Sequence, residues 1–182
     1  LYAENDVYIG GKLRHNGDVD NYLGFGTDIQ SFVTGNSTRA QFSNTLVRFN
    51  QEGINQDFQI FGENNDNLFY ADASTDRIGI GTAAPDTNLH VFKATAGTIT
   101  NYANNALVVE NSGDVGISLL TPNANAGHLM FGSPANQYHS YIRGGYGAST
   151  TSTLKFYTDG INTMTHKAGE VGIGTDTPDL KL

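Results

Sequence analysis

Apolar and polar residues alternate in short runs along most of the chain, and the runs are separated by stretches rich in Gly, Asn, Asp and Ser. An alternation of period two places the apolar side chains on one face of a β-strand. No stretch sustains the 3.6-residue period of an amphipathic helix. The pattern therefore predicts an all-β chain of short strands joined by tight turns.

Several turn signals lie between alternating runs and predict hairpins. The clearest is Asn16-Gly17, because Asn-Gly is typical of two-residue hairpin turns. Two more lie at residues 72–76 and at 111–114, and across the second of these residues 107–109 and 115–117 would pair. The last three runs predict a three-stranded meander formed by residues 154–158, 163–167 and 170–173.

One phrase that alternates bulky and small residues occurs three times. Its copies are Val171–Pro178 (VGIGTDTP), Ile78–Pro85 (IGIGTAAP) and the weaker Val115–Pro122 (VGISLLTP). The small residues leave one face of the strand bare, so another backbone can approach it. The Pro ends the strand, because it has no N–H for the ladder.

The glycines of this phrase allow a geometric prediction. We expect Gly81 and Gly174 to have a positive φ, or to lie where a Cβ would clash. We also expect the copies at Ile78 and Val171 to form the same strand and turn. The third copy has Ser and Leu in place of Gly and Thr, so we expect it to depart from the others after Ile117.

The phrase Gly-Ile-Gly-Thr-x-x-Pro, followed by Leu-x-Val at residues 89–91, resembles the repeat unit of phage tail-fibre and spike proteins. Longer members of that group often end in an endosialidase-type intramolecular chaperone domain. Further segments similar to the family's repeats are residues 31–34, 67–74 and 155–160. The resemblance implies a homotrimeric intertwined β fibre, with a triple β-helix or β-prism-like shaft, on the surface of a virion.

In such a trimer the apolar side of each strand would point to the threefold axis and would be completed by two further copies. Ile80 and Ile173 are then expected to be nearly fully buried at subunit contacts. The expected trimer core consists of the β-branched residues of the three phrases, Ile78, Ile80, Val115, Ile117, Val171 and Ile173.

The phrases also suggest how the chain is divided. Residues 93–105 are rich in Ala, Thr and Asn and lack firm periodicity, so they are predicted to form a linker or short insert. Residues 1–92 would form a first β fibre module and residues 106–182 a second. The start at Leu1 shows no signal peptide, and we expect further chain to precede it.

Composition favours association of chains. A monomer of this length would bury roughly 70% of its unfolded surface. That is difficult for a chain with 38% hydrophobic residues, 22 Gly and no Trp. The chain has no Cys, which excludes disulfides and thiolate metal sites. Stability is therefore expected to come from β pairing and subunit contacts.

Charge and hydropathy exclude two classes of partner. The net charge is −8 and the ten basic residues are scattered, whereas nucleic-acid binding needs clustered Lys and Arg. No apolar run approaches the roughly 20 residues of a membrane helix. We therefore expect neither nucleic-acid binding nor membrane insertion.

The sequence gives little support for enzyme chemistry. A glycosidase needs two carboxylates across a cleft, but most acidic residues here occupy turn positions. The Gly-x-Gly elements have no following helix start or Lys-Ser/Thr pair, so they are not phosphate loops. We expect no enzyme activity and no cofactor. The predicted turn formers are Asp18, Asp20, Asp72, Asp76, Asp114, Asp159 and Asp179.

One histidine, His90, lies within an alternating run. His90 lies between Leu89 and Val91, so alternation places it on the polar side of a strand, where we expect it to face solvent. The alternative is a position at the threefold axis, where three copies would form a metal site.

The stretch from Tyr138 to Tyr146 is the best candidate for contact with a receptor. Aromatic rings beside polar donors suit sugars, and we expect a loop here that protrudes from the shaft. Alternatively, Tyr141 and Ile142 are ordinary strand residues and the Gly run is a surface loop. The candidate receptor contacts are Tyr138, His139, Arg143 and Tyr146.

Together these observations predict a structural segment of a viral tail or capsid fibre that serves reach and host-cell attachment. Its partners would be two further copies, other virion proteins and a host surface glycan. One alternative is a glycan-degrading tail spike. Another is a bacterial surface adhesin filament, because similar repeats occur in bacterial surface proteins.

Overall fold

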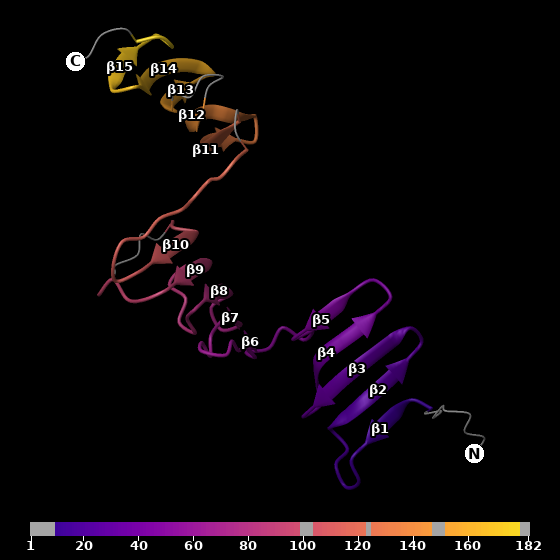
Figure 1. Cartoon of the computed structure of the whole chain (residues 1–182). Helices are drawn as coiled ribbons and strands as arrows, with labels where there is room; N and C mark the ends of the chain where they lie inside the picture. Colours follow the sequence, from indigo (N-terminus) through magenta and orange to yellow (C-terminus); the bar gives the residue numbers. More distant parts are fainter. Residues whose placement is uncertain (1–9, 99–103, 123–124, 147–151, 179–182) are drawn as a thin grey trace. The chain divides into compact units, whose positions relative to one another are not determined.

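The computed structural model describes residues 10–98, 104–122, 125–146 and 152–178. Figure 1 shows that these residues form strands and connecting segments. They contain fifteen strands and no helix, in three sheets of five strands each. The all-β prediction is confirmed. No helix that could cross a membrane occurs among the described residues.

The first sheet is an antiparallel meander in which each strand pairs with the next along the chain. The hairpin predicted at Asn16-Gly17 is confirmed, and Gly17 has φ +83°. The β3–β4 turn uses Gly35 and Asn36, which both have positive φ, as tight hairpins require. The strands are β1 (Lys12–Arg14), β2 (Tyr22–Gly26), β3 (Ile29–Thr34), β4 (Ser37–Ser43) and β5 (Val47–Phe49).

The second sheet is mixed and has the order β10-β9-β8-β7-β6. The strands β6, β7 and β8 are antiparallel, whereas β9 pairs parallel with both β8 and β10. The hairpin predicted at residues 72–76 is confirmed as β7–β8. The strands are β6 (Phe58–Ile60), β7 (Phe69–Asp72), β8 (Arg77–Ile80), β9 (Leu89–Phe92) and β10 (Leu107–Glu110).

The hairpin predicted across residues 111–114 is wrong. β10 pairs parallel with β9, with Leu107 opposite Leu89, and residues 114–122 contain no strand. The structure divides into two compact units, Leu1–Gly116 and Ile117–Leu182. The predicted linker at residues 93–105 lies in the sequence between β9 and β10, which belong to the same sheet.

The third sheet is again an antiparallel meander, and it confirms the predicted three-stranded pattern at the end of the chain. The first two strands are longer than their alternating runs, so the stretch from Tyr138 to Tyr146 belongs to a strand. The expectation of a protruding loop there is wrong. The strands are β11 (Ala126–Ser133), β12 (Asn136–Tyr146), β13 (Ser152–Thr158), β14 (Ile161–Lys167) and β15 (Glu170–Ile173).

The described residues form almost no apolar core. Among the described residues, the only apolar side chains that are buried are Val33, with 5% of its surface exposed, and Pro85. Large apolar side chains remain exposed in every sheet, among them Phe32, Ile60 and Leu129. Each sheet therefore has an apolar face that the described residues leave largely exposed.

Candidate functional site

The apolar faces follow from the strand registers. Residues directly opposite one another in neighbouring strands project to the same face, and in each sheet one such row is apolar across all five strands. In the first sheet the row is Leu13, Leu23, Phe32, Ala40 and Phe49. In the second it is Phe58, Ala71, Ile78, Leu89 and Leu107. In the third it is Leu129, Ile142, Phe156, Met164 and Ile173.

Four of the predicted trimer-core residues lie on these faces. Ile78 and Ile80 are in β8, on the apolar face of the second sheet. Val171 and Ile173 are in β15, on that of the third, and Ile173 is 82% exposed. The single chain therefore leaves Ile173 open for contact with another element.

The repeated phrase ends its strand by the same device in two copies. In both, the Thr hydroxyl accepts the N–H two residues on: Thr82 Oγ1 from Ala84 at 3.0 Å and Thr175 Oγ1 from Thr177 at 3.2 Å. The second glycines have positive φ, +85° at Gly81 and +69° at Gly174. The prediction for these glycines is confirmed.

In each of these copies, residues of the following turn occupy the space where a side chain of the first glycine would lie. A Cβ at Gly172 would lie 2.6 Å from Thr175 Cγ2 and 3.2 Å from Pro178 Cβ. A Cβ at Gly79 would overlap the carbonyl oxygen of Thr82. The bare face of the strand is thus filled by its own turn, and the bulky face is left free.

The third copy departs from the pattern earlier than we expected. Val115 and Ile117 are exposed and belong to no strand, and a Cβ at Gly116 would meet no atom within 4 Å. This copy lacks both the second Gly and the Thr hydroxyl that close the turn in the other two. The departure therefore begins at Val115 and not after Ile117.

The four candidate receptor residues occupy different environments in β12. Tyr138 is 56% exposed and lies where an irregularity interrupts the pairing of β12 with β11. His139 is exposed, with Nδ1 at 3.4 Å from Asp159 Oδ1. Arg143 is half-buried, contrary to the expectation of an exposed side chain. The backbone of Tyr146 pairs with Ser152, and its side chain lies outside the described residues.

Sequence reasoning missed the neighbours that the third sheet gives to Arg143. The register places His128, Arg143 and Lys155 side by side on β11, β12 and β13. The adjacent row on the same face contains Tyr141 and Tyr157, whose rings stack at 4.3 Å with an interplanar angle of 11°. Only the pairing of strands distant in sequence brings these residues together, so no local motif could have revealed them.

A shallow hollow adjoins this strip of aromatic and basic side chains. Its lining combines a guanidinium, an imidazole, a phenol ring and an amide, a set of groups that suits a sugar. The lining residues are Thr121, Pro122, Asn125, Ala126, His128, Tyr141 and Arg143.

At its other end the strip carries an ion pair. Lys155 donates a hydrogen bond to Asp176, and Asn162 Nδ2 donates to the same carboxylate at 2.7 Å. These bonds, chiefly that from Lys155, lower the pKa of Asp176 below its ordinary value. Asp176 is in the turn of the last phrase, so this ion pair ties the turn to β13.

His90 lies on the polar side of β9 as expected, but the expectation that it faces solvent is wrong. It is 2% exposed, and its Nε2 lies 3.1 Å from Glu110 Oε2. The other Glu110 oxygen accepts the N–H of Ala96 at 2.6 Å. This buried bridge joins β9, β10 and the segment that follows β9. Because Leu89 and Val91 form the apolar face, His90 points to the opposite side of the sheet.

The ligand-type atoms of Asp86, His90 and Glu110 lie within 4.8 Å of one another. Asp86 approaches the ring at Nδ1, where Oδ2 lies at 3.7 Å and the backbone N–H donates at 3.3 Å. Glu110 approaches at Nε2, on the opposite edge. The contacts of the two ring nitrogens make the cluster a hydrogen-bonded bridge between strands.

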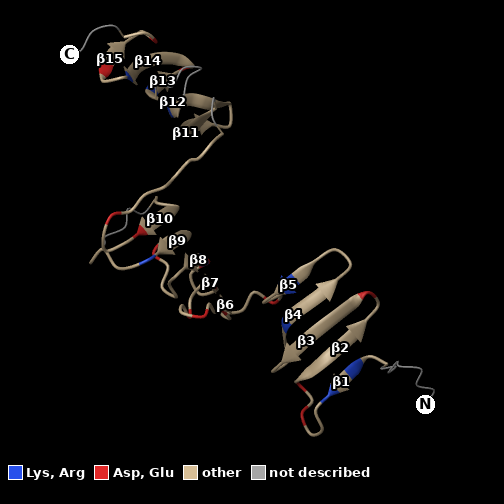
Figure 2. Ribbon diagram, in the orientation of Figure 1, with Lys and Arg blue, Asp and Glu red and all other residues tan. Residues whose placement is uncertain are grey.

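The acidic residues mainly shape turns, and Figure 2 shows many of them in the connecting segments. Asp18 Oδ1 accepts the N–H groups of Asp20 and Asn21, both at 3.1 Å. Asp72 Oδ1 accepts the N–H of Ser74 at 2.9 Å. Two more acidic residues have positive φ in turns, Asp76 and Asp159. The prediction for Asp179 lies outside the described residues.

Comparison with known proteins gives no assignment, since no protein-family model matches the chain and no curated protein matches it significantly. The geometry of the three sheets is therefore the observation from which a function is inferred.

Proposed function

We propose that the chain is a segment of a homotrimeric β fibre on the surface of a virion, a tail or capsid fibre that provides reach and attaches to a host cell. The observation that carries the proposal is the uncovered apolar face of each of the three sheets. A sheet with one hydrophobic face must bury that face against another element. Among the described residues, only the segment 117–120 approaches one of these faces, and Leu129 and Ile173 of that face remain exposed.

The energy available from covering these faces is large. Full burial of one Leu, Ile or Phe side chain contributes roughly 1.5–3 kcal/mol, and the apolar row of each sheet contains four such residues. Three copies would form a prism in which like sheets face one another across the axis. A dimer would instead pack each sheet against its copy as a sandwich. The resemblance to tail-fibre repeats favours the trimer.

The polar faces would then form the outside of the fibre. On the third sheet this outside carries the strip of His128, Arg143, Tyr141 and Tyr157 and its hollow. A host surface glycan is the proposed partner of this strip, because sugars combine apolar ring faces with hydroxyl groups. Three copies of a weak site would raise the apparent affinity for a polymeric receptor by about 10²-fold or more. Other virion proteins would hold the fibre in place.

Light scattering coupled to size exclusion tests the proposal. The expected mass is three times that of the chain, with no folded monomer at micromolar concentration. A folded monomer at that concentration would overturn the trimer. Attachment is tested separately by adsorption of the protein to host cells. An Arg143→Gln variant should adsorb more weakly, with unchanged mass, whereas Arg48→Gln in the first sheet should adsorb like the parent.

A further inference from the structure

The repeated phrase pairs with other strands of its own chain in two copies, whereas the third copy has no strand partner among the described residues. The segment Ile78–Ile80 lies in β8, which pairs with β7, and the segment Val171–Ile173 lies in β15, which pairs with β14. Both strands belong to five-stranded sheets. In the third copy, no backbone hydrogen bond within the described residues involves residues 115–121. The same pattern of bulky and small residues thus lacks a partner in one of its three occurrences.

The unpaired copy is apolar and open to solvent. Val115, Ile117 and Leu119 alternate with the small residues Gly116 and Ser118. Ile117 is 67% exposed, and Leu120, which follows the alternation, is 91% exposed. Strand-forming segments with free N–H and C=O groups and apolar side chains are templates for pairing with another chain. As a part of an isolated chain this segment would be a liability.

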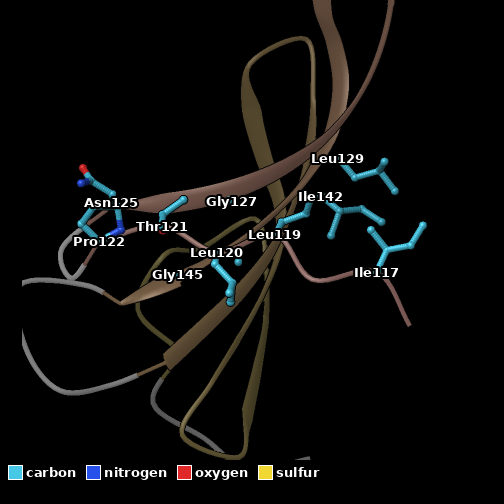
Figure 3. A pocket seen from close by; sticks show the side chains of 11 residues that line it. Ile117, Leu119, Leu120, Thr121, Pro122, Asn125, Gly127, Leu129, Ile142 and Gly145 are labelled. Atoms are coloured by element: carbon cyan, nitrogen blue, oxygen red, sulfur yellow. The ribbon is translucent and has the colours of Figure 1, made fainter. Parts of the chain in front are cut away.

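The segment is already positioned beside the third sheet. The carbonyl oxygen of Leu119 lies 3.2 Å from the place of a Cβ on Gly127, so the two backbones are in close contact. Figure 3 shows Ile117 beside Leu129 and Ile142, and these side chains line one hollow of the surface. Leu129 and Ile142 belong to the apolar row of the third sheet. The exposed segment therefore continues an apolar face that itself needs covering.

We propose that the segment Val115–Leu120 is an intertwining point, where each chain pairs with neighbouring copies of the chain. Val115, Ile117 and Leu119 would form apolar layers, each completed by two further chains. The N–H and C=O groups along the edges of the segment would bond the neighbouring backbones, and the small residues Gly116 and Ser118 leave room on its other face. This inference rests on the proposed trimer and adds that the chains exchange backbone pairing at this segment.

The charge of the segment fits a second copy better than a different partner. Residues 115–122 contain no charged side chain, so three copies can meet at one axis without repulsion. Their uncharged, β-branched residues resemble the interior of a subunit contact, where charged residues are depleted. The alternation also fixes the register between chains, because a slip by one residue would place Gly116 in an apolar layer.

Hydrogen exchange on the assembled protein tests the pairing directly. If neighbouring chains bond this segment, the amides of residues 116–120 should exchange more than about tenfold more slowly than an unprotected peptide. If they exchange freely in a protein whose mass is that of a trimer, the intertwining is overturned while the trimer stands. A monomeric mass would overturn the trimer and the intertwining together, so the two failures are distinguishable.

Disulfide trapping gives a second, independent test, and the absence of native Cys removes the background. In an Ile117→Cys variant, oxidation should link two chains of each trimer, because a disulfide requires Cα atoms roughly 4.4–6.8 Å apart. The control is Asn44→Cys, at an exposed turn between β4 and β5, which should remain unlinked. Equal linking of both variants, or none at position 117 in a trimer of normal mass, would contradict the proposal.

Discussion

Thr82 folds back so that its carbonyl oxygen occupies the place of a Cβ on Gly79. The contact joins the first and last parts of the phrase, since Gly79 lies in β8 and Thr82 in the turn that follows. The equivalent contact in the last copy is between Thr175 and Gly172. The spacing of Gly and Thr in this phrase therefore has a steric reason, because only a residue without a side chain admits the returning turn.

Replacement of Gly79 or Gly172 by Ala should lower stability. At Gly79 the added Cβ would meet backbone, which cannot move away by rotating a side chain, and we expect a loss of about 2 kcal/mol or more. At Gly172 the nearest atom is a Thr methyl group, so the loss should be smaller. Chemical denaturation of both variants measures the order. Gly113→Ala, where a Cβ would make only an ordinary contact at 3.8 Å, should stay within about 0.5 kcal/mol of the parent.

Ile173→Asp separates an assembled protein from a monomeric one. In the single chain Ile173 is 82% exposed, so a monomer should tolerate the change within about 0.5 kcal/mol. In the proposed trimer three carboxylates would meet in an apolar layer, and assembly should fail. Thr177→Asp, at an exposed turn residue of the same phrase, is the matched control and should assemble. A variant at position 173 that keeps the parent mass would place the subunit contact elsewhere.

Sequence patterns predicted the local structure well and the partners of strands poorly. Alternation and turn chemistry were sufficient for the β7–β8 hairpin, whose turn is built by Asp72 and its neighbours. They could not predict that β9 pairs parallel with β8 and β10, because alternation carries no information on which strands meet or in which register. The buried bridge between His90 and Glu110 depends on that pairing. The sequence therefore could not predict this bridge, although both residues lie in alternating runs.

Removal of the Glu110 carboxylate should destabilise the second sheet. A Glu110→Ala change leaves His90 Nε2 and the N–H of Ala96 without their acceptor, and an unsatisfied buried group costs roughly 1–3 kcal/mol. Glu110→Gln keeps an acceptor oxygen and should lose less. Glu63, in an exposed turn, provides the control as Glu63→Ala. Equal stability of the alanine variants at 110 and 63 would show that the bridge adds nothing to stability.

Asp176 should make the stability of the protein depend on pH on the acid side. Its hydrogen bonds from Lys155 and Asn162 lower its pKa below the ordinary 3.8. A carboxyl group with a lowered folded pKa stabilises the fold above its unfolded pKa, and this contribution is lost as the pH falls through the folded pKa. The melting temperature of the parent should therefore exceed that of Asp176→Asn at neutral pH, and the difference should shrink as the pH falls below 3.8. Melting curves between neutral pH and about pH 2.5 measure this.

Because the Asp176 side chain is largely exposed, added salt should also reduce the difference in melting temperature between the parent and Asp176→Asn. A pH-independent difference for Asp176→Asn would show that the ion pair does not contribute to the stability.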